Sequence, residues 1–587
     1  MNTIAIDFES YYDKECSVRI LGLLGYFSHP EFDAYRVSAV GDDGTNFVGC
    51  PKEDFDWSII EGNLILSHNA QFDETLYLYG VDQGWWKKFD YADWVCTADL
   101  AAYCGLPRSL KGATTTLYNL EVDKSTRDNM SGKRWEGMTK EFQDEVDEYA
   151  LKDSELCLKL WQDLEGDWPQ QERDISLANR RCVQRGIPID TELLKESLIT
   201  INEKLFEAEN SIPWIDDKPI LSRKAFNEEC KKEGLIPPAS LALTDEDANK
   251  WIKEHEGKYE WISAVRNYRR INSLKRKLES FEYATMGDQR YYGGILYHGA
   301  HTGRFSGSGG NLNLQNLPRG EMFGVNLRSL ISPKKGKKLV VVDLSQIEVR
   351  TLCWLAEDQV SLEEIKQSDD IYEAFAIRFD KWDKSKGVLK DEDPSLRHLV
   401  KTMVLGCGYS VSAKKFALIS NMDEEEAVKA VHLYRTKMKR VVSLWNKLQR
   451  QLHVAYSLGT DFVVDLPSGR SLNYGVIQNQ LQFGRRNYMA MIAKGIKKIP
   501  VKLYGGLLTE NASQALARDI FSDIIIRLEK RGLGIIFHVH DEVVVEVDEN
   551  EAEGTLELII QEMRTPPEWI PDIPLDAEGK ILDKYEK

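Results

Sequence analysis

The chain has 587 residues, more than one hydrophobic core usually serves, so we expect two to four domains. Its 42% hydrophobic and 29% charged residues are ordinary for globular proteins and exclude a disordered or low-complexity chain. The net charge of −18 (76 basic against 94 acidic side chains) argues against a nucleic-acid partner, but basic clusters at 265–278, 333–338 and 435–440 keep that partner possible.

The first part of the chain, residues 1 to about 165, reads as an α/β unit. Strand-like runs at 3–10 and 64–68 alternate with helical patterns at 71–80 and 144–164. This alternation predicts a first domain that ends near residues 163–169.

The rest of the chain reads as a larger α+β domain. Residues 170 to about 290 are helical, with interruptions at Pro and Trp, and a glycine-rich turn region follows. A strand-like run at 338–348 precedes a helical block at about 360–460, and the apolar runs of 535–547 predict a hairpin.

Neither a membrane span nor a disulfide framework is expected. No run approaches the roughly 18 apolar residues of a spanning helix, and the N-terminus has no signal-peptide pattern, so we expect a cytoplasmic protein. Nine scattered cysteines without a C-x-x-C pair favour reduced thiols over disulfides, and structural zinc is the weaker alternative.

Carboxylates cluster by pattern in the first domain. Asp7 and Glu9 lie two apart on a predicted buried strand, so both point to one face, where a divalent cation such as Mg²⁺ or Mn²⁺ would keep them ionised. Asp73 lies at a helix start, and Tyr149 and Asp153 share one helix face. For any single acid a surface charge or helix cap is the simpler reading, but the set favours a metal site.

The order of these residues carries a resemblance. D-x-E, N-x-x-F-D and Y-x-x-x-D resemble the three motifs of the DEDD superfamily of proofreading 3′–5′ exonucleases, and residues 97–114 are similar to that family as well. The resemblance implies an RNase H-like fold and two-metal hydrolysis. It implies metal ligands at Asp7, Glu9, Asp73 and Asp153, with Tyr149 orienting the attacking water, as in the subclass with Tyr.

A second pair of carboxylates is expected in the larger domain. Asp343 ends the strand-like run KLVVVD, and Asp541 stands with Glu542 at the tip of the predicted hairpin. Acids on adjacent strands can hold two metal ions against a triphosphate. Chance pairs of such acids are common, so this pattern alone leaves other metal sites open.

A stripe of four side chains adds to that pair. Arg397, Lys401, Leu405 and Tyr409 are spaced by four, which on a helix places two cations, an apolar residue and an aromatic on one face. Such a stripe can grip phosphates and meet a base. A solvated basic helix end is the alternative, and Gly406 and Gly408 weaken the case for a continuous helix.

These segments together resemble family A (Pol I-like) DNA polymerases of the phage-encoded replicative type. The motifs are D-x-S-Q-I-E-x-R, R-x-x-x-K followed by L-G-x-G-Y, and H-D-E, with similar stretches at 301–320, 466–474 and 509–519. The resemblance implies a right-hand polymerase domain and a DNA-directed DNA polymerase with 3′–5′ exonuclease activity. It implies phage genome replication, two Mg²⁺ ions per active site (Mn²⁺ as an alternative), primer-template DNA, dNTPs and a monomer, with a helicase, primase or processivity factor as further candidate partners.

Residue roles follow from the same resemblance. Asp343 and Asp541 would hold the metals with Glu542 in support, and Glu348 would exclude a 2′-hydroxyl. Arg397 and Lys401 would bind the triphosphate, and Tyr409 would lie at the templating position. The remaining implied substrate contacts, including those to the primer end and its minor groove, are Arg304, Gln346, Leu405, Gln514 and His540.

Two positions depart from the family pattern. Leu405 stands where an aromatic is usual, which leaves sugar discrimination open, and Ser410 stands where Gly usually follows the tyrosine. Because the chain starts directly at the exonuclease strand, we expect no 5′ nuclease domain. The implied domains are exonuclease 1–165 and polymerase 166–587, with palm 166–190, 291–357 and 501–587, thumb 191–290 and fingers 358–500.

Two other function classes fit these motifs less well. A nuclease with a merely DNA-binding C-terminal half would need neither Asp343 and Asp541 nor the triphosphate cations. A single-subunit RNA polymerase is disfavoured by Glu348 and by the proofreading motifs.

Overall fold

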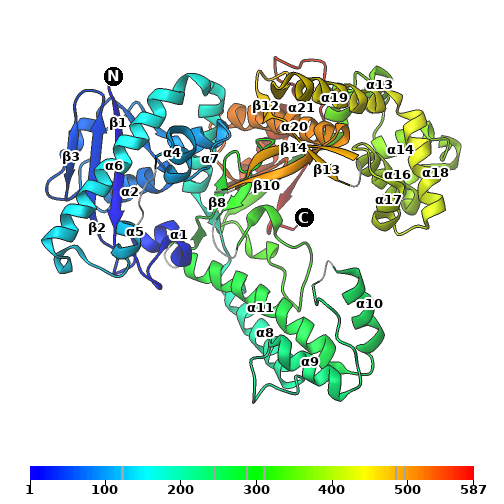
Figure 1. Ribbon diagram of the computed structural model, residues 1–587, viewed down its shortest axis with the longest axis horizontal. Coiled ribbons are helices and arrows are strands. Elements are labelled where there is room, and N and C mark those ends of the chain that lie inside the picture. Colours follow the sequence, from blue (N-terminus) through cyan, green and yellow to red (C-terminus); the bar gives the residue numbers. More distant parts are fainter. Residues whose placement is uncertain are drawn as a thin grey trace.

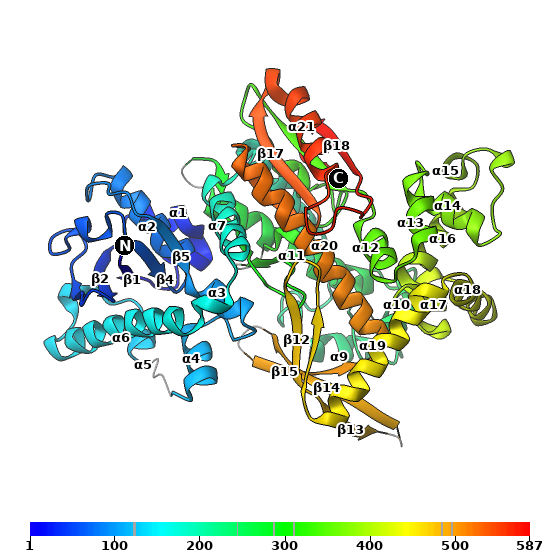
Figure 2. The same cartoon turned by 90° about the horizontal axis from the view of Figure 1, so that it is seen from above.

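The computed structural model describes residues 1–586 except 121–124, 243–244, 286–287, 309–311, 483–484 and 495–496. Figure 1 shows an N-terminal α/β unit on one side, a central body around a sheet, a helical arm below it and a second helical body on the far side. In the view from above in Figure 2 the helical arm lies behind the central body, and the long helix α20 (Gly505–Lys530) runs through the centre.

The N-terminal unit is built on a five-stranded mixed sheet of order β3-β2-β1-β4-β5. β1 pairs antiparallel with β2 and parallel with β4, so β1 lies in the middle of the sheet. The strands are β1 (Thr3–Ser10), β2 (Ala34–Gly41), β3 (Asn46–Gly49), β4 (Leu64–Ser67) and β5 (Asp93–Cys96). The helices are α1 (Val18–Phe27), α2 (Ala70–Asp82), α3 (Thr97–Tyr103), α4 (Leu110–Tyr118), α5 (Ser125–Met130) and α6 (Lys140–Leu164).

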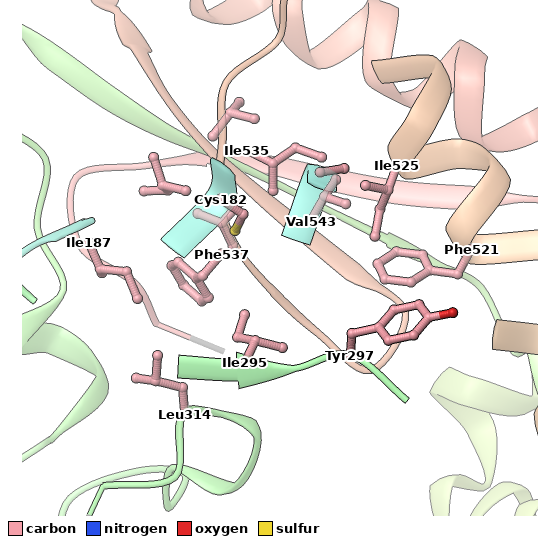
Figure 3. Close-up of a cluster of buried hydrophobic side chains, with 14 of the residues drawn as sticks. Cys182, Ile187, Ile295, Tyr297, Leu314, Phe521, Ile525, Ile535, Phe537 and Val543 are labelled. Atoms are coloured by element: carbon pink, nitrogen blue, oxygen red, sulfur yellow. The ribbon is translucent and has the colours of Figure 1, made fainter. Parts of the chain in front are cut away.

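The expected domain join coincides with the end of α6, and α7 (Gln170–Arg185) follows it. The apolar core does not stop there. A single cluster of buried side chains runs from Leu66 and Trp161 of the N-terminal unit through Cys182 of α7 to Phe521 of α20. Figure 3 shows the part where α7 meets the central body, with Cys182, Phe537 and Ile295 side by side. Because the core is continuous, burial of apolar area holds the two halves together.

The helical arm, expected for residues 170–290, has a small core of its own. α8 and α11 pack against each other along the arm in Figure 1. Beyond them Trp214, Phe226 and Trp261 form a separate buried cluster. The arm helices are α8 (Thr191–Asn210), α9 (Arg223–Lys232), α10 (Glu246–His255) and α11 (Glu260–Ala284).

The central body contains an antiparallel sheet of order β16-β17-β10-β18. α20, buried along most of its length, and α21, which packs on β10 and β18, contribute to its core. The large elements are β10 (Lys337–Leu344), β16 (Ile535–Val539), β17 (Glu542–Asp548), β18 (Ala577–Leu582), α20 (Gly505–Lys530) and α21 (Ala552–Arg564). Short strands β6 (Ile187–Pro188), β7 (Arg290–Tyr291), β8 (Gly294–Leu296) and β9 (Ser306–Ser308) precede them. The expected strand near 338–348 and the hairpin at 535–547 are both confirmed.

The expected helical block at 360–460 is also confirmed. Several of these helices begin after an acidic residue that caps the helix N-terminus. Before α16 (Pro394–Cys407), for example, Asp393 accepts a hydrogen bond from the Leu396 N–H, and Pro394 occupies the first helical position. The helices are α12 (Ile347–Leu355), α13 (Gln359–Lys366), α14 (Ile371–Arg378), α15 (Leu389–Glu392), α16 (Pro394–Cys407), α17 (Ala413–Ser420), α18 (Glu424–Lys437) and α19 (Lys439–Leu458). In the described part of the chain no helix is long and apolar enough to cross a membrane.

The sequence pattern does not predict the elements between 460 and 535. Besides α20 these are β11 (Asp461–Asp465), β12 (Ser471–Val476), β13 (Gln478–Gln482), β14 (Arg485–Lys494) and β15 (Lys497–Leu503). β11 pairs with β12, and β13, β14 and β15 form a separate three-stranded sheet. Runs of Gln, Arg and Lys dilute the apolar alternation that usually marks strands, so pairing between the strands, which local sequence does not display, defines them.

Candidate active sites

The central sheet brings Asp343 and Asp541 together. Asp343 lies near the end of β10 and pairs in register with Glu542 of β17. The N–H of Leu344 donates to the carbonyl of Asp541, with 3.1 Å between nitrogen and oxygen. The two acids, far apart in sequence, are therefore neighbours at one end of the sheet, as expected.

The turn that carries Asp541 is short, and hydrogen bonds to Gln315 hold it in place. Val539 pairs with Glu542, which leaves His540 and Asp541 as the turn, and His540 has a φ of 56°, in the left-handed region. Gln315 holds both sides: its Nε2 donates to the His538 carbonyl at 2.7 Å, and its Oε1 accepts from the His540 N–H at 3.0 Å. Local sequence does not single out Gln315, because its partners come from the distant hairpin.

Glu542 has a different environment from the acid before it. Its side chain is buried, and the Tyr585 hydroxyl donates to its Oε1 at 2.6 Å. Burial, and then the Glu542 charge, raise the pKa of Tyr585, so this hydroxyl keeps its proton for the bond. A carboxylate oxygen already engaged in this way fits the supporting role expected for Glu542.

The predicted stripe is correct for three of its four members. Arg397, Lys401 and Leu405 lie on α16, but that helix ends at Cys407. Tyr409 lies in the turn beyond it, where Ser410 has a φ of 64°. The single helical stripe is therefore wrong at Tyr409, because α16 ends two residues before it.

The two cations of α16 lie beside an aromatic ring. The Arg397 guanidinium carbon is 5.2 Å, and the Lys401 Nζ 5.9 Å, from the centre of the Tyr372 ring. Arg397 is also held by Asp370, with 2.5 Å between Nε and Oδ2. That hydrogen bond raises the pKa of Arg397. In this arrangement Lys401 is exposed, whereas Arg397 would have to exchange Asp370 for a phosphate.

Several predicted substrate contacts meet between α12, α20 and the loop that holds Arg304. Arg304 Nη2 lies 2.5 Å from Glu348 Oε1. The Tyr409 hydroxyl donates to Ser513 Oγ at 3.3 Å, and Ser513 Oγ donates to the Glu348 carbonyl at 3.2 Å. The ion pair and Ser513 hold Glu348 from two sides, a connection that sequence spacing does not predict.

The remaining predicted contacts border this group. Gln346 precedes α12 with a φ of 49°, and Gln514 follows Ser513 on α20, where its Nε2 donates to Glu510 Oε1 at 3.3 Å. Burial and then the charge of Arg304 lower the pKa of His540, so a neutral imidazole is favoured there.

The N-terminal acids surround one cavity of about 760 Å³. All five predicted residues line it, from three elements: Asp7 and Glu9 on β1, Asp73 in the first turn of α2, and Tyr149 and Asp153 on α6. The lining also includes Ala284 of the helical arm and Tyr292, which lies between β7 and β8. The sequence-based expectation that these acids converge is confirmed.

Burial dominates the electrostatics of this cavity. It raises the pKa of Glu9 and of Asp73 to about 8, and for Asp7 burial and then the Glu9 charge place the pKa well above its ordinary value. Arg127, which the sequence pattern does not single out, also lines the cavity, and its charge lowers the pKa of Asp7 and Glu9 in part. The acids therefore need further positive charge to ionise together at neutral pH.

The donor chemistry of both sites fits hard divalent cations, which prefer carboxylate oxygens. Among the residues that the structure describes, no three His, Cys, Asp or Glu side chains already form a cluster that could hold a metal ion. A cation bound by the acids of the N-terminal cavity would draw them closer and relieve the repulsion that burial intensifies.

These raised pKa values predict that the free energy of unfolding depends on pH when a chelator keeps divalent metal ions away from the protein. The folded-state pKa of Glu9 is raised from 4.5 to about 8, so its contribution to stability is present below pH 4.5 and lost as the pH rises through 8. We expect the free energy of unfolding to fall between about pH 5 and about pH 8, and Mg²⁺ or Mn²⁺ to flatten the fall. Urea titrations across this pH range measure the free energy of unfolding. For Glu9→Gln this free energy should change less steeply with pH. An unchanged steepness would contradict the raised pKa of Glu9.

The chain is similar to known polymerases in sequence and in fold. Residues 219–464 match the family model described as DNA polymerase family A, a range that includes Arg304, Asp343 and α16 but neither Asp541 nor the acids of the N-terminal cavity. A "DNA polymerase" of Bacillus phage SP02 is 25% identical over the full length of both chains. The thermostable "DNA polymerase I" of Thermus aquaticus is 23% identical over 75% of this chain, which spans about half of that relative's length.

A solved structure extends the likeness to the fold. It is described as the "POL domain of Pol1 from M. smegmatis complex with DNA primer-template and dNTP", and it matches with a TM-score of 0.69 and 19% identity over 100% of this chain and 95% of that one. The chain therefore has the mixed α and β fold of that POL domain, and residues 219–464 are similar to DNA polymerases of family A.

Proposed function

We propose that the protein is a template-directed DNA polymerase that adds deoxynucleotides to a primer 3′ end, with a 3′–5′ proofreading exonuclease in residues 1–165. The observation that carries the polymerase assignment is the meeting of Asp343 and Asp541 at one end of the sheet within a family A polymerase fold. The match of residues 219–464 to family A, whose members use divalent metal ions, and the phage relative support it.

In synthesis, Asp343 and Asp541 would hold two Mg²⁺ ions, which neutralise the triphosphate and favour ionisation of the primer 3′-hydroxyl. The hydroxyl oxygen attacks the α-phosphorus, and pyrophosphate leaves. Arg397 and Lys401 would bind the triphosphate charge. Glu348 would reject a ribose 2′-hydroxyl, and Tyr409 would lie at the templating position.

In proofreading, the acids that line the N-terminal cavity, Asp7, Glu9, Asp73 and Asp153, would hold the metal ions. Tyr149 would orient the attacking water; burial raises its pKa well above the ordinary value, so the hydroxyl keeps its proton and can accept from or donate to that water. The products are a nucleoside monophosphate and a primer shortened by one residue.

The domain roles proposed are those of a right hand. The palm comprises 166–190, 291–357 and 501–587, the thumb 191–290 and the fingers 358–500. The helical arm with its basic cluster in 265–278 supports the thumb assignment, since cations there can track duplex phosphates and let an acidic chain hold DNA. With its phage relative, the protein fits phage genome replication in the host cytoplasm.

Primer extension with the purified protein tests this proposal. We expect template-dependent addition of deoxynucleotides in Mg²⁺ and little addition of ribonucleotides. Binding of DNA without extension would favour a nuclease whose C-terminal half only binds nucleic acid, and preferential use of ribonucleotides would favour an RNA polymerase.

Leu405→Phe is expected to change sugar selection. Leu405 is half-buried on α16, four residues beyond Lys401, and a flat ring there would add contact to the incoming sugar. The ratio of dideoxynucleotide to deoxynucleotide incorporation should rise about tenfold, which corresponds to about 1.4 kcal/mol. Competition assays on one template measure the ratio, and equal ratios for the two proteins would remove this position from sugar selection.

A further inference from the structure

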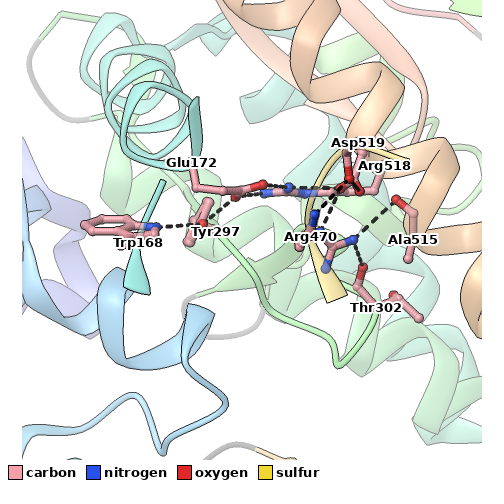
Figure 4. A network of polar contacts seen from close by, with 9 residues as sticks. Trp168, Glu172, Tyr297, Thr302, Arg470, Ala515, Arg518 and Asp519 are labelled. Carbon is pink, nitrogen blue, oxygen red and sulfur yellow. Dashed lines mark hydrogen bonds and ion pairs between the residues drawn. The ribbon is translucent and has the colours of Figure 1, made fainter. Parts of the chain in front are cut away.

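A buried network of charged side chains lies beside Thr302 (Figure 4). It joins α7, α20 and the loop before β12 and comprises Glu172, Arg470, Arg518 and Asp519. Each of the four is at most 8% exposed. Charges buried this deeply destabilise a fold unless each has several partners, so the geometry of the network is tightly restricted.

Each acid of the network is paired with an arginine. Arg518 Nη2 donates to Glu172 Oε2 at 2.9 Å, and Arg470 Nε donates to Asp519 Oδ1 at 2.9 Å. Burial alone raises the pKa of Glu172, but Arg518 more than offsets this and lowers it to about 2. Glu172 therefore stays ionised at neutral pH, and the ion pairs hold the members of the network in place.

Arg470 also binds the main chain at two places. Its Nη2 lies 2.8 Å from the carbonyl of Thr302 and 3.3 Å from that of Ala515. Thr302 is two residues before Arg304, and Ala515 directly follows Gln514. One guanidinium group, fixed by Asp519, thus holds the backbone beside Arg304 and Gln514, two of the three residues expected at the primer end with His540.

The loop with Arg304 packs directly on this guanidinium. Gly303 has a φ of 84°, and a Cβ atom there would lie 2.7 Å from Arg470 Nη1. Only a glycine permits both this conformation and this approach. The close fit leaves the loop little freedom to shift relative to α20.

We propose that Arg470 is a positioning residue that sets the spacing between Arg304 and Gln514, and with it the register in which the primer end is read. The inference rests on the proposed polymerase function. Minor-groove acceptors shared by all correct pairs can be checked by two donors only if the donors keep a set separation. Lysine cannot replace Arg470, because a single ammonium lacks the planar fork that binds Asp519 and two carbonyls together.

Single-nucleotide extension of matched and mismatched primer ends tests the role of Arg470. Primers that end in a phosphorothioate linkage resist 3′ hydrolysis and isolate the synthesis step. For Arg470→Lys we expect kcat on matched ends to fall about 10- to 100-fold, since a displacement near 1 Å can have that effect. The KM for the dNTP should stay within about threefold of the parent value, because α16 is unchanged. The ratio of extension rates for matched over mismatched primer ends should fall.

Two further variants separate positioning from stability. Gly303→Ala keeps every charge but pushes the loop away from Arg470. It should therefore lower the preference for matched over mismatched primer ends, and it tests the proposal even if Arg470→Lys does not fold. Arg527→Lys is the matched control: on the same helix α20, Arg527 bonds Asp523, Glu562 and the Thr565 carbonyl. It should lower thermal stability at most and leave the preference for matched ends unchanged.

The outcomes are distinct. If both Arg470→Lys and Gly303→Ala keep the parent's preference for matched ends, or if Arg527→Lys narrows it equally, the positioning role is wrong. If the parent protein extends no primer, the proposed function itself fails, and the inference fails with it.

Discussion

Asp343→Ala is expected to abolish primer extension, with a fall in rate of at least about 10³-fold, while hydrolysis of single-stranded 3′ ends continues at the parent rate. The acid lies at the end of β10 beside Asp541, where two metal ions and a triphosphate would be held. Stabilisation of charge by such ions contributes several kcal/mol to the barrier, and each 1.36 kcal/mol is a factor of ten. Extension and hydrolysis are measured on the same labelled primer, with and without template.

Asp548→Ala is the matched control for this variant. Asp548 ends β17 in the same sheet, at the opposite end from Asp541, and its Oδ1 forms an exposed ion pair with Lys337 Nζ at 2.9 Å. Exposed pairs of this kind contribute about 0–1 kcal/mol, so extension should be unchanged. Normal extension by Asp343→Ala would show that the carboxylate at the end of β10 does not support synthesis.

Asp7→Ala is expected to produce the opposite result: loss of 3′ hydrolysis by at least about 10³-fold, with extension retained. Asp7 is half-buried and lines the N-terminal cavity, where desolvation and then the charges of Glu9, Asp73 and Asp153 raise its pKa. Removing one of several mutually repelling acids should also raise the melting temperature in chelator and reduce the stabilisation by Mg²⁺. Degradation assays and thermal melts with and without Mg²⁺ measure both effects.

Asp90→Ala serves as the control in the N-terminal unit. Asp90 is exposed, with its Oδ1 3.3 Å from Lys88 Nζ, and lines no part of the cavity. Both activities and the effect of Mg²⁺ on the melting temperature should match the parent. If Asp7→Ala still hydrolysed 3′ ends, the N-terminal cavity would not be the exonuclease site, and the polymerase proposal would be unaffected.

The continuous core bears on how the two proposed activities would coexist in one chain. α7 follows the N-terminal unit directly and packs its Cys182 into the central body, and Arg108, which lines the N-terminal cavity, donates through Nη1 to the Tyr297 carbonyl at 2.8 Å. A substitution in this interface should therefore disturb both sites through stability, whereas Asp7 and Asp343 variants should separate them.

Local sequence patterns predict much of this molecule. Alternation in TIAIDFES places Asp7 and Glu9 on one face of β1, and the spacing of Tyr149 and Asp153 places them on one face of α6. Apolar runs predict β10 and the β16–β17 hairpin. These expectations hold because side-chain direction in a strand or helix depends on the periodicity of that element alone.

Other features escape local patterns. The strands between 461 and 503 are rich in polar residues and are defined by their mutual pairing. Tyr409 leaves the helix that its spacing from Leu405 predicts, because α16 ends at Cys407. The roles of Gln315 and Arg470 depend on partners from distant segments, and no single segment contains a signal for them.

Outside residues 460–535, the sequence by itself determined most of the elements and which of them carry the acids and the two cations of α16, since propensity, capping and periodicity are short-range properties. Only the tertiary structure decided which of these residues meet. Antiparallel pairing of β10 with β17 makes Asp541 a neighbour of Asp343, and Arg470, paired with Asp519, joins the Thr302 carbonyl to that of Ala515. Such contacts follow from burial of a shared core and from the need of every buried charge for a partner, and both conditions are met only when the whole chain is folded.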